Sequence, residues 1–224
     1  LLRLVERQGT KGRKLEGEFY DRYKEVRERL FNVIRLNNPD FPGRPGELLR
    51  LTQRLLDRFI FAFFCEDMGE RMLFPPQMLK DFLRSRSVEP FYDENGPELW
   101  AFFKRLFGLM NSGGTLNRLT LPEINGGLFE SDPLIDDLSI PNHVFAKAGQ
   151  GANEASLESD TNTLVYLGAR YNYAGRGHVT ESLSLYILGH ILAQSITELE
   201  YREGELEGRE TIAQLSKRKR DGVY

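Results

Sequence analysis

The segment from residue 46 to residue 69 constrains the fold more than any other part of this sequence, because it is apolar around most of a helix. One stripe with spacings of three and four residues consists of Leu48, Leu51, Leu55, Phe59 and Phe63, and a second set widens it, namely Leu49, Leu56, Ile60 and Phe64. A helix that is apolar over this much of its surface is normally covered by other elements. Gly69 predicts where it ends. We therefore expect a central helix with the rest of the chain packed around it.

Amphipathic helices are predicted on both sides of this segment. In residues 15–36, one face carries Phe19, Tyr23, Val26, Leu30 and Val33, while Arg22, Arg27, Glu28 and Arg29 lie elsewhere around the helix. Shorter helices are predicted at about 75–84, 97–110, 163–173 and 183–199. The charged stretch 202–218 is typical of a surface helix or a connector.

The helical period disappears between residues 111 and 162. Ser112-Gly113-Gly114 and Gly126-Gly127 predict turns, and the apolar residues near 119–129 fit short strands or extended segments. Residues 146–162 predict an exposed, mobile loop. The expected fold class is therefore mainly α: a multi-helix domain with a small irregular or β-containing insertion around residues 112–162.

The sequence offers little that could carry catalysis. The most apolar run, Phe59–Cys65, is seven residues long and too short to cross a membrane, and charged residues follow the first leucines too soon for a signal peptide. One cysteine cannot form an internal disulfide, which favours a cytoplasmic location, and three scattered histidines with one cysteine do not form a structural zinc site. Cys65 is expected in the core. We assign no catalytic residue, no metal site and no cofactor to this chain.

Charge is distributed unevenly along the chain, although the formal net charge is only -3. Residues 1–37 contain ten Lys or Arg against six Asp or Glu, whereas residues 122–163 contain eight acids against one lysine. The basic run Lys217, Arg218, Lys219 and Arg220 follows near the end. Such a run is typical either of a contact to the phosphates of a DNA backbone or of a solvated linker, and both interpretations stay open.

Two further groups of residues are expected to serve structure. Glu66 and Asp67 end the apolar helix, where their carboxylates can reach arginines such as Arg54 or Arg58 in an ion pair or hydrogen bond; a catalytic role is the alternative. Asn125, Gly126 and Gly127 are expected to form a turn that defines the fold, because glycine adopts positive φ easily, with direct ligand contact as the alternative.

Five segments, in order along the chain, resemble large fused restriction-modification enzymes. They are Leu56-Asp57-Arg58-Phe59-Ile60-Phe61 with Phe64-Cys65-Glu66-Asp67-Met68-Gly69; Leu121-Pro122-Glu123-Ile124-Asn125-Gly126-Gly127-Leu128-Phe129; Leu138-Ser139-Ile140-Pro141-Asn142 with Phe145; Ile187-Leu188-Gly189-His190-Ile191-Leu192-Ala193-Gln194-Ser195-Ile196; and Lys217-Arg218-Lys219-Arg220-Asp221-Gly222-Val223-Tyr224. In that family, a basic pair followed by Gly-x-Tyr leads into an adenine-specific DNA methyltransferase domain. The resemblance covers residues 15–224, and this part of the chain is similar to the helical connector of a type IIG-like enzyme.

The resemblance implies a fragment of a larger protein. It implies an N-terminal segment, residues 1–14, after an upstream domain; a helical connector domain, residues 15–200; and a charged linker, residues 201–224, that enters a methyltransferase domain. S-adenosylmethionine and Mg²⁺ are implied for the parent enzyme and neither for this chain, which lacks the glycine loop and the Asn/Asp-Pro-Pro-Tyr/Phe motif. Leu192-Ala193 replaces the family's usual Phe-Glu, so no role for that glutamate is carried over.

The leading functional hypothesis is a non-catalytic connector that spaces a nuclease module and an adenine methyltransferase module and contacts the DNA backbone at its periphery. Its implied partners are double-stranded DNA, through the parent enzyme, and the two adjacent domains, with no membrane. The rival hypothesis is a helical protein–protein interaction domain that does not bind DNA, favoured by the acidic region 122–163. An independent enzyme is the weakest alternative.

Overall fold

The computed structural model describes residues 2–72, 74–116, 118–124, 127–173, 183 and 185–206. It confirms the mainly α fold class with a small two-stranded insertion. None of the helices in these ranges combines the length and the apolar character that a transmembrane segment requires.

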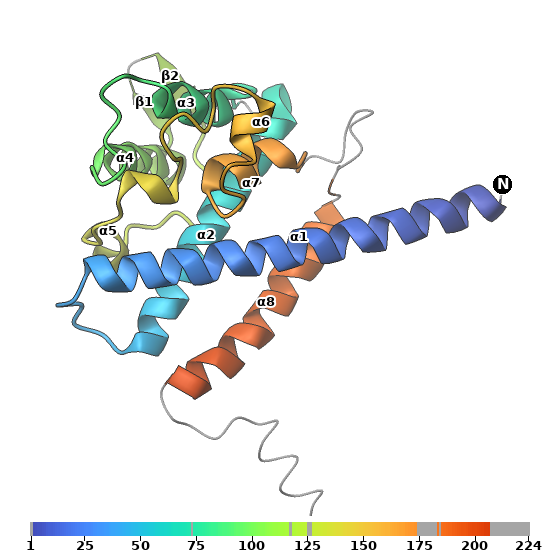
Figure 1. The fold of residues 1–224 in the computed structure, drawn as a ribbon, viewed down its shortest axis with the longest axis horizontal. Helices are drawn as coiled ribbons and strands as arrows, with labels where there is room; N and C mark the ends of the chain where they lie inside the picture. The colour runs from blue at the N-terminus through green and yellow to red at the C-terminus, as the bar shows by residue number, and fades with distance from the viewer. Residues whose placement is uncertain are drawn as a thin grey trace, which may run out of the picture.

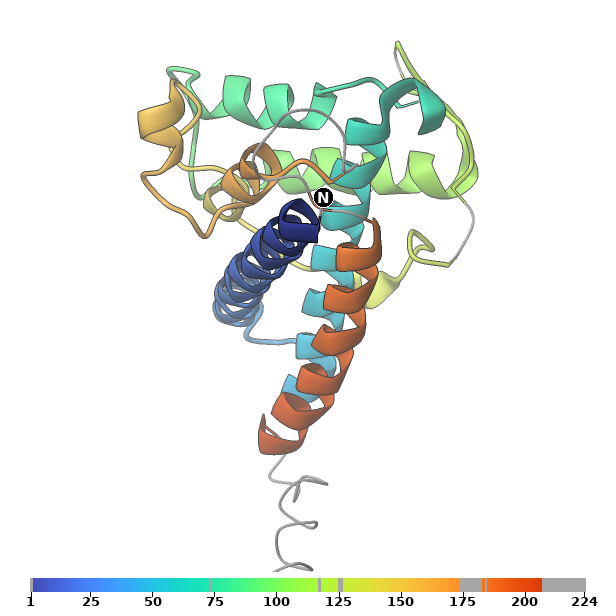
Figure 2. The same cartoon turned by 90° about the vertical axis from the view of Figure 1, so that its right-hand side faces the viewer.

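Three long helices form the frame of the molecule: α1 (Leu2–Asn37), α2 (Pro45–Met68) and α8 (Leu185–Leu206). Figure 1 shows α1 crossing the molecule, with its N-terminal part reaching beyond the rest of the fold. Figure 2 shows α8 side by side with α2, and the two helices run in opposite directions, since Arg50 near the start of α2 pairs with Glu203 near the end of α8 at 2.9 Å. Both α1 and α8 therefore meet on α2.

Shorter elements pack around the C-terminal half of α2 and form the upper part of Figure 1. They are the 3-10 helix η1 (Gly69–Met72), α3 (Met78–Ser87), α4 (Glu98–Ser112), β1 (Gly114–Leu116), β2 (Leu119–Leu121), α5 (Pro133–Asp136), the 3-10 helix η2 (Asn142–Val144), α6 (Glu154–Leu157) and α7 (Leu164–Arg170). The two strands are antiparallel, and Thr115 lies opposite Thr120.

The core confirms that α2 is central. Its aromatic stripe packs against α4 and against the segment after η2: the ring of Phe59 meets Phe103 at 4.7 Å and Phe145 at 5.7 Å, both edge-on. Phe103 in turn stacks on Phe145 at 5.1 Å. Such pairs add about 1 kcal/mol each beyond the burial of their area. The apolar circumference predicted for residues 46–69 is thus filled by partners on several sides.

The long helices differ in extent from the predictions. α1 begins at Leu2 rather than near residue 15, and α8 runs without a break through the predicted boundary at 199. The face predicted for α1 is correct: Phe19, Tyr23, Val26 and Leu30 are buried. The predicted position of Arg27, away from that face, is wrong, because its side chain is fully buried.

Residues 146–162 are also more ordered than the mobile loop predicted from their composition. The buried amide of Gln150 donates hydrogen bonds to the carbonyls of Leu157 and Asp160, at 3.1 and 2.7 Å, and to Thr163 Oγ1 at 2.7 Å. Asn153 caps α6 in a capping box with Ser156. A single buried glutamine therefore folds this polar segment onto itself.

Candidate functional site

Two arginines of α2 hold the turn that contains Gly127 and precedes α5. Arg58 Nε donates to the carbonyl of Leu128 at 2.8 Å and Arg58 Nη2 to that of Glu130 at 2.6 Å. Arg54 donates to the Gly127 carbonyl at 3.1 Å and pairs with Asp132 at 2.9 Å. Burial lowers the pKa of the Arg58 guanidinium from its ordinary value, as does the neighbouring Arg54. The planar fork of arginine matches two carbonyls that a lysine could not satisfy together.

The acids at the end of α2 hold α3 and the segment after α7. The Glu66 carboxylate accepts the backbone N–H of Leu79 at 2.6 Å and of Lys80 at 3.4 Å, so it binds two free donors in the first turn of α3. Asp67 pairs with Lys80 at 2.5 Å and accepts the backbone N–H of Tyr173 at 2.8 Å. Their partners are Lys80 and backbone amides, instead of the arginines Arg54 and Arg58 considered from the sequence.

A buried polar network joins the three long helices. Arg27 of α1 reaches Gln53 of α2 at 3.3 Å and pairs with Glu198 of α8 at 3.1 Å. Glu198 also accepts the hydroxyl of Tyr20 at 2.5 Å. We call this group, together with Tyr23 and Asp57, the three-helix junction. It connects residues that are 171 positions apart in the chain, from Arg27 to Glu198.

The α2 side of the junction holds a strongly desolvated carboxyl. Asp57 Oδ1 accepts the Tyr23 hydroxyl at 2.6 Å and the Gln53 amide at 2.8 Å, and Gln53 also donates to the Tyr23 oxygen. Burial raises the pKa of Asp57 to about 6, although the two hydrogen bonds and the charge of Arg27 oppose that rise. Arg27 Nε is buried without a hydrogen-bond partner among the described residues. The junction is therefore costly in free energy and specific in geometry.

Metal-binding clusters and the single cysteine were the remaining candidates for chemistry in the described residues. Within them, no three His, Cys, Asp or Glu side chains lie close enough to hold a metal ion. Cys65 is buried, and burial raises the pKa of its thiol to about 12, so it stays protonated and unreactive. The prediction that Cys65 belongs to the core is confirmed.

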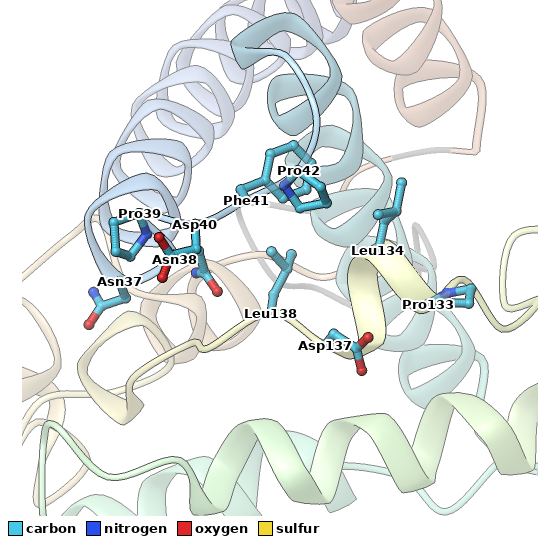
Figure 3. Close-up of a pocket in the computed structure, with 10 residues that line it drawn as sticks. All are labelled: Asn37, Asn38, Pro39, Asp40, Phe41, Pro42, Pro133, Leu134, Asp137 and Leu138. Atoms are coloured by element: carbon cyan, nitrogen blue, oxygen red, sulfur yellow. The ribbon is translucent and has the colours of Figure 1, made fainter.

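One pocket of about 340 Å³ lies between the α1–α2 connection and α5, as Figure 3 shows. Its walls include the carboxylates of Asp40 and Asp137, which have neither a histidine nor a lysine beside them in the lining. Asn38 at its rim accepts the backbone N–H of Ser139 at 2.8 Å and donates to the Ser139 carbonyl at 2.9 Å. The pocket is a seam between two loops that are tied together by Asn38.

The sequence-predicted site residues are therefore dispersed. Arg58, Glu66 and Asp67 lie on α2: Arg58 binds the turn before α5, Glu66 binds the start of α3, and Asp67 binds both Lys80 of α3 and the segment after α7. Gly127 has a φ of 73° and its carbonyl accepts Arg54, which places it in the turn held by α2. The predicted turn residues Asn125 and Gly126 and the predicted DNA-contact residues lie outside the described residues; the latter are Lys217, Arg218, Lys219 and Arg220.

The two charge blocks seen in the sequence meet at Asp160. Arg29 of the basic helix pairs with Asp160 of the acidic region, and Arg22 donates to Thr161 at 2.8 Å. Lys147 also pairs with Asp160, at 3.3 Å, and these cations lower the pKa of Asp160 although burial opposes them. Part of the acidic segment that suggested an outside partner is thus neutralised within the fold.

The comparison with protein families decides what this framework is similar to. Residues 50–129 match the family model described as "MmeI, helicase spacer domain". MmeI is a type IIG restriction-modification enzyme, and the match supports a connector region of such an enzyme. The matched segment begins in α2 and contains α3, α4, the hairpin and the turn held by Arg58. None of the curated proteins and none of the solved structures compared with the chain matches it.

Sequence reasoning missed the junction residues Arg27 and Glu198. A signal for Arg27 was present: it lies four residues after Tyr23 and three before Leu30, so it belongs to the buried side of α1. Its charge concealed this position, because arginines are usually on the solvent side of a helix. Glu198 had no comparable local signal, since its partners come from α1.

Proposed function

We propose that this chain is a non-catalytic helical spacer that holds a nuclease module and an adenine-specific methyltransferase module of a restriction-modification enzyme at a fixed separation and angle. The match of residues 50–129 to a spacer family supports this assignment. The observation that carries it is the three-helix junction, in which α1 and α8 are joined to α2 by one buried polar network.

The free-energy cost of this network indicates that its role is to fix the geometry of the helices rather than to stabilise the fold. Apolar residues of similar volume often stabilise a fold more than a buried ion pair does. The benefit of Arg27 is directional: its guanidinium has partners on both α2 and α8, so the relative positions of three helices are specified together. A spacer requires this property, because the modules at its ends must act at defined positions on one DNA molecule.

Helix length supports the same role. α1 has 36 residues, which corresponds to about 54 Å of rigid length. A flexible chain of equal length has a root-mean-square span of only about 30–36 Å with wide fluctuations. A continuous helix anchored at the junction therefore transmits a distance and a direction that a linker does not.

The chemistry belongs, in this proposal, to the neighbouring modules. S-adenosylmethionine and Mg²⁺ would be bound there. The spacer also contacts the DNA backbone at its periphery, and Lys217, Arg218, Lys219 and Arg220 are the first candidates. Replacing these four residues with alanine in the full-length protein should weaken DNA binding and flatten its salt dependence; an unchanged slope removes them from the interface.

A direct test of the spacer function loosens the junction in the full-length enzyme. Glu198→Gln removes the charge that pairs with Arg27, and Glu205→Gln is the control on the exposed side of α8. We expect Glu198→Gln to keep methylation but to spread the positions of DNA cleavage over several base pairs, with no spread in the control. Unchanged cleavage positions in both variants would contradict the proposal.

The rival function is a helical docking domain for another protein, without DNA binding. Its supporting observation is the loop after α3, where Phe91 is 97% exposed and Val88 47% exposed. Titration of the full-length protein with duplex DNA at low and high salt separates the two. Salt-dependent binding supports the spacer, and absence of binding at low salt supports the docking domain.

A further inference from the structure

After Glu98, the first residue of α4, the helix and the β1–β2 hairpin form a continuous stretch without acidic residues. No Asp or Glu occurs from residue 99 to residue 122, although the whole chain carries 33 acids. The same stretch contains Lys104, Arg105 and Arg118. It lies entirely within the segment that matches the spacer family.

The two arginines of this stretch differ from most other cations of the fold. Both are exposed, and neither makes an ion pair or hydrogen bond with any residue in the described part of the chain. Several other cations pair with carboxylates, such as Arg50 with Glu203, Arg84 with Glu154 and Arg86 with Glu89. Arg35 and Arg71 are the further exposed arginines without a carboxylate partner among the described residues. Lys104 is occupied as well, because its ammonium donates to the Asp136 carbonyl at 3.0 Å. Arg105 and Arg118 are therefore available to an external anion.

The surface around these arginines allows close approach. The exposed side of α4 has Ala101, Arg105, Gly108 and Ser112, at spacings of four, three and four residues. Glu98 is exposed on the same side, three residues before Ala101, but its carboxylate accepts the Asn142 amide at 2.8 Å. From Ala101 to Ser112, Arg105 is the one long side chain of this exposed set. On the hairpin, the exposed Thr115 and Thr120 hydroxyls lie 2.9 Å apart. Arginines beside hydroxyls and small residues are the groups that contact DNA phosphates.

The hairpin is rigidly mounted on α4. Gly113 ends the helix with a φ of 65°, and a Cβ placed there would lie 2.8 Å from the Glu123 nitrogen. The backbone N–H of Gly113 donates to Leu109 at 2.9 Å, and that of Ile124 donates to Met110 at 2.8 Å. Both ends of the hairpin are thus tied to the last turn of α4. Arg118 lies between the two strands, so these bonds fix the position of its hairpin relative to α4.

We propose that α4 and the β1–β2 hairpin form a second contact surface for the phosphates of duplex DNA, with Arg105 and Arg118 neutralising backbone charge. Ser112, Thr115 and Thr120 supply hydroxyl donors beside them. The inference rests on the proposed function and assigns its DNA contact to described residues in the middle of the chain. Such contacts give affinity and position without reading sequence.

The test is the salt dependence of duplex binding by the full-length protein, measured with a labelled non-specific duplex. Each neutralised phosphate contributes about 0.9 to the slope of log K against log salt concentration, so Arg105→Ala with Arg118→Ala should lower the slope by about 2. The matched control, Arg35→Ala with Arg71→Ala, removes the same charge from two other exposed arginines, one on α1 and one on η1. The pair Arg105→Lys and Arg118→Lys should keep most of the slope.

The outcomes separate this surface from the function on which it rests. A wild-type protein that does not bind duplex DNA at low salt overturns both. Salt-dependent binding by the wild type with an unchanged slope in the Arg105/Arg118 alanine variant overturns only the surface. An equal loss in the control variant also overturns it, because net charge alone then explains the effect. Circular dichroism of each variant verifies that the helices are retained.

Discussion

The guanidinium of Arg27 on α1 pairs with the carboxylate of Glu198 on α8 at 3.1 Å, across 171 positions of sequence. Arg27 is fully buried while the side chain of Glu198 is 32% exposed, so the pair lies at the edge of the core. Arg27 is additionally bound to Gln53 of α2. This pair, together with the Tyr20–Glu198 hydrogen bond and the Arg202–Glu28 ion pair, holds the first and last described helices against each other, which is the relationship that a spacer must maintain.

Truncation of Arg27 should be among the most damaging changes on α1. Arg27→Ala removes a large buried side chain and leaves Gln53 and Glu198 without their partner, so we expect a loss of about 3 kcal/mol in the free energy of unfolding. Arg27→Met keeps the volume and should lose less than about 1.5 kcal/mol. Urea titration followed by the fluorescence of Trp100, the single tryptophan, measures both.

An exposed ion pair provides the control for that experiment. Arg86 and Glu89 lie 2.9 Å apart with side chains 40% and 45% exposed. Arg86→Ala should change the unfolding free energy by less than about 0.5 kcal/mol. Equal effects at Arg27 and Arg86 would contradict the structural role of the junction.

Arg58→Lys tests whether the two-pronged bond of arginine holds the turn before α5. Lysine keeps the charge but cannot donate to the Leu128 and Glu130 carbonyls in the same way. We expect a loss of about 1–3 kcal/mol, and faster amide exchange concentrated at residues 127–130. Exchange that rises uniformly over the whole chain would show that the effect is global and that the turn has no special dependence on Arg58.

Stability should decrease as pH rises toward neutrality, because two buried carboxyls hold their protons more tightly in the folded state. Burial raises the pKa of Glu66 to about 7 from an ordinary 4.5, against the opposing hydrogen bonds from α3. The contribution of Glu66 to the unfolding free energy is then largest below pH 4.5 and falls by up to about 3 kcal/mol as pH passes through 7. Glu66→Gln should remove this decline between pH 4.5 and 7 in urea titrations.

Asp57 gives the matched comparison. Its pKa is raised by burial to about 6, so its part of the decline lies between about pH 4 and 6 and should survive in Glu66→Gln. Asp57→Asn should remove that lower part alone. A pH profile unchanged by either substitution would show that these carboxyls do not titrate as their burial requires.

The sequence predicted what depends on local periodicity. The apolar circumference of α2, the buried face of α1 with Phe19 and Leu30, and the change to short strands after residue 111 follow from spacing and from turn residues. These features involve neighbours within one helix or one hairpin. The fold class was therefore predictable.

What was missed depends on partners far apart in the chain. No local pattern pairs Arg27 with Glu198, or places the Asp67 carboxylate at 2.8 Å from the amide of Tyr173, 106 positions away. The loop predicted at residues 146–162 was wrong for the same reason. The composition of this segment suggested a mobile loop, and only the fold shows that the amide of Gln150 donates to three acceptors. Glu66 and Asp67 of α2 were predicted to have a structural role, but their actual partners, Lys80 and backbone amides, were not predicted.

Two helical glycines should respond in opposite directions to the same substitution. A Cβ on Gly168 of α7 would meet the ring of Phe63 at 2.7 Å in the core, whereas Gly108 on the exposed side of α4 has open space. Gly108→Ala should stabilise the chain by about 0.5–1 kcal/mol through helix propensity. Gly168→Ala should destabilise it by about 1–3 kcal/mol, because Phe63 is fully buried and has no room to shift. Urea midpoints that move in the same direction for both variants would contradict the close packing of α7 on α2.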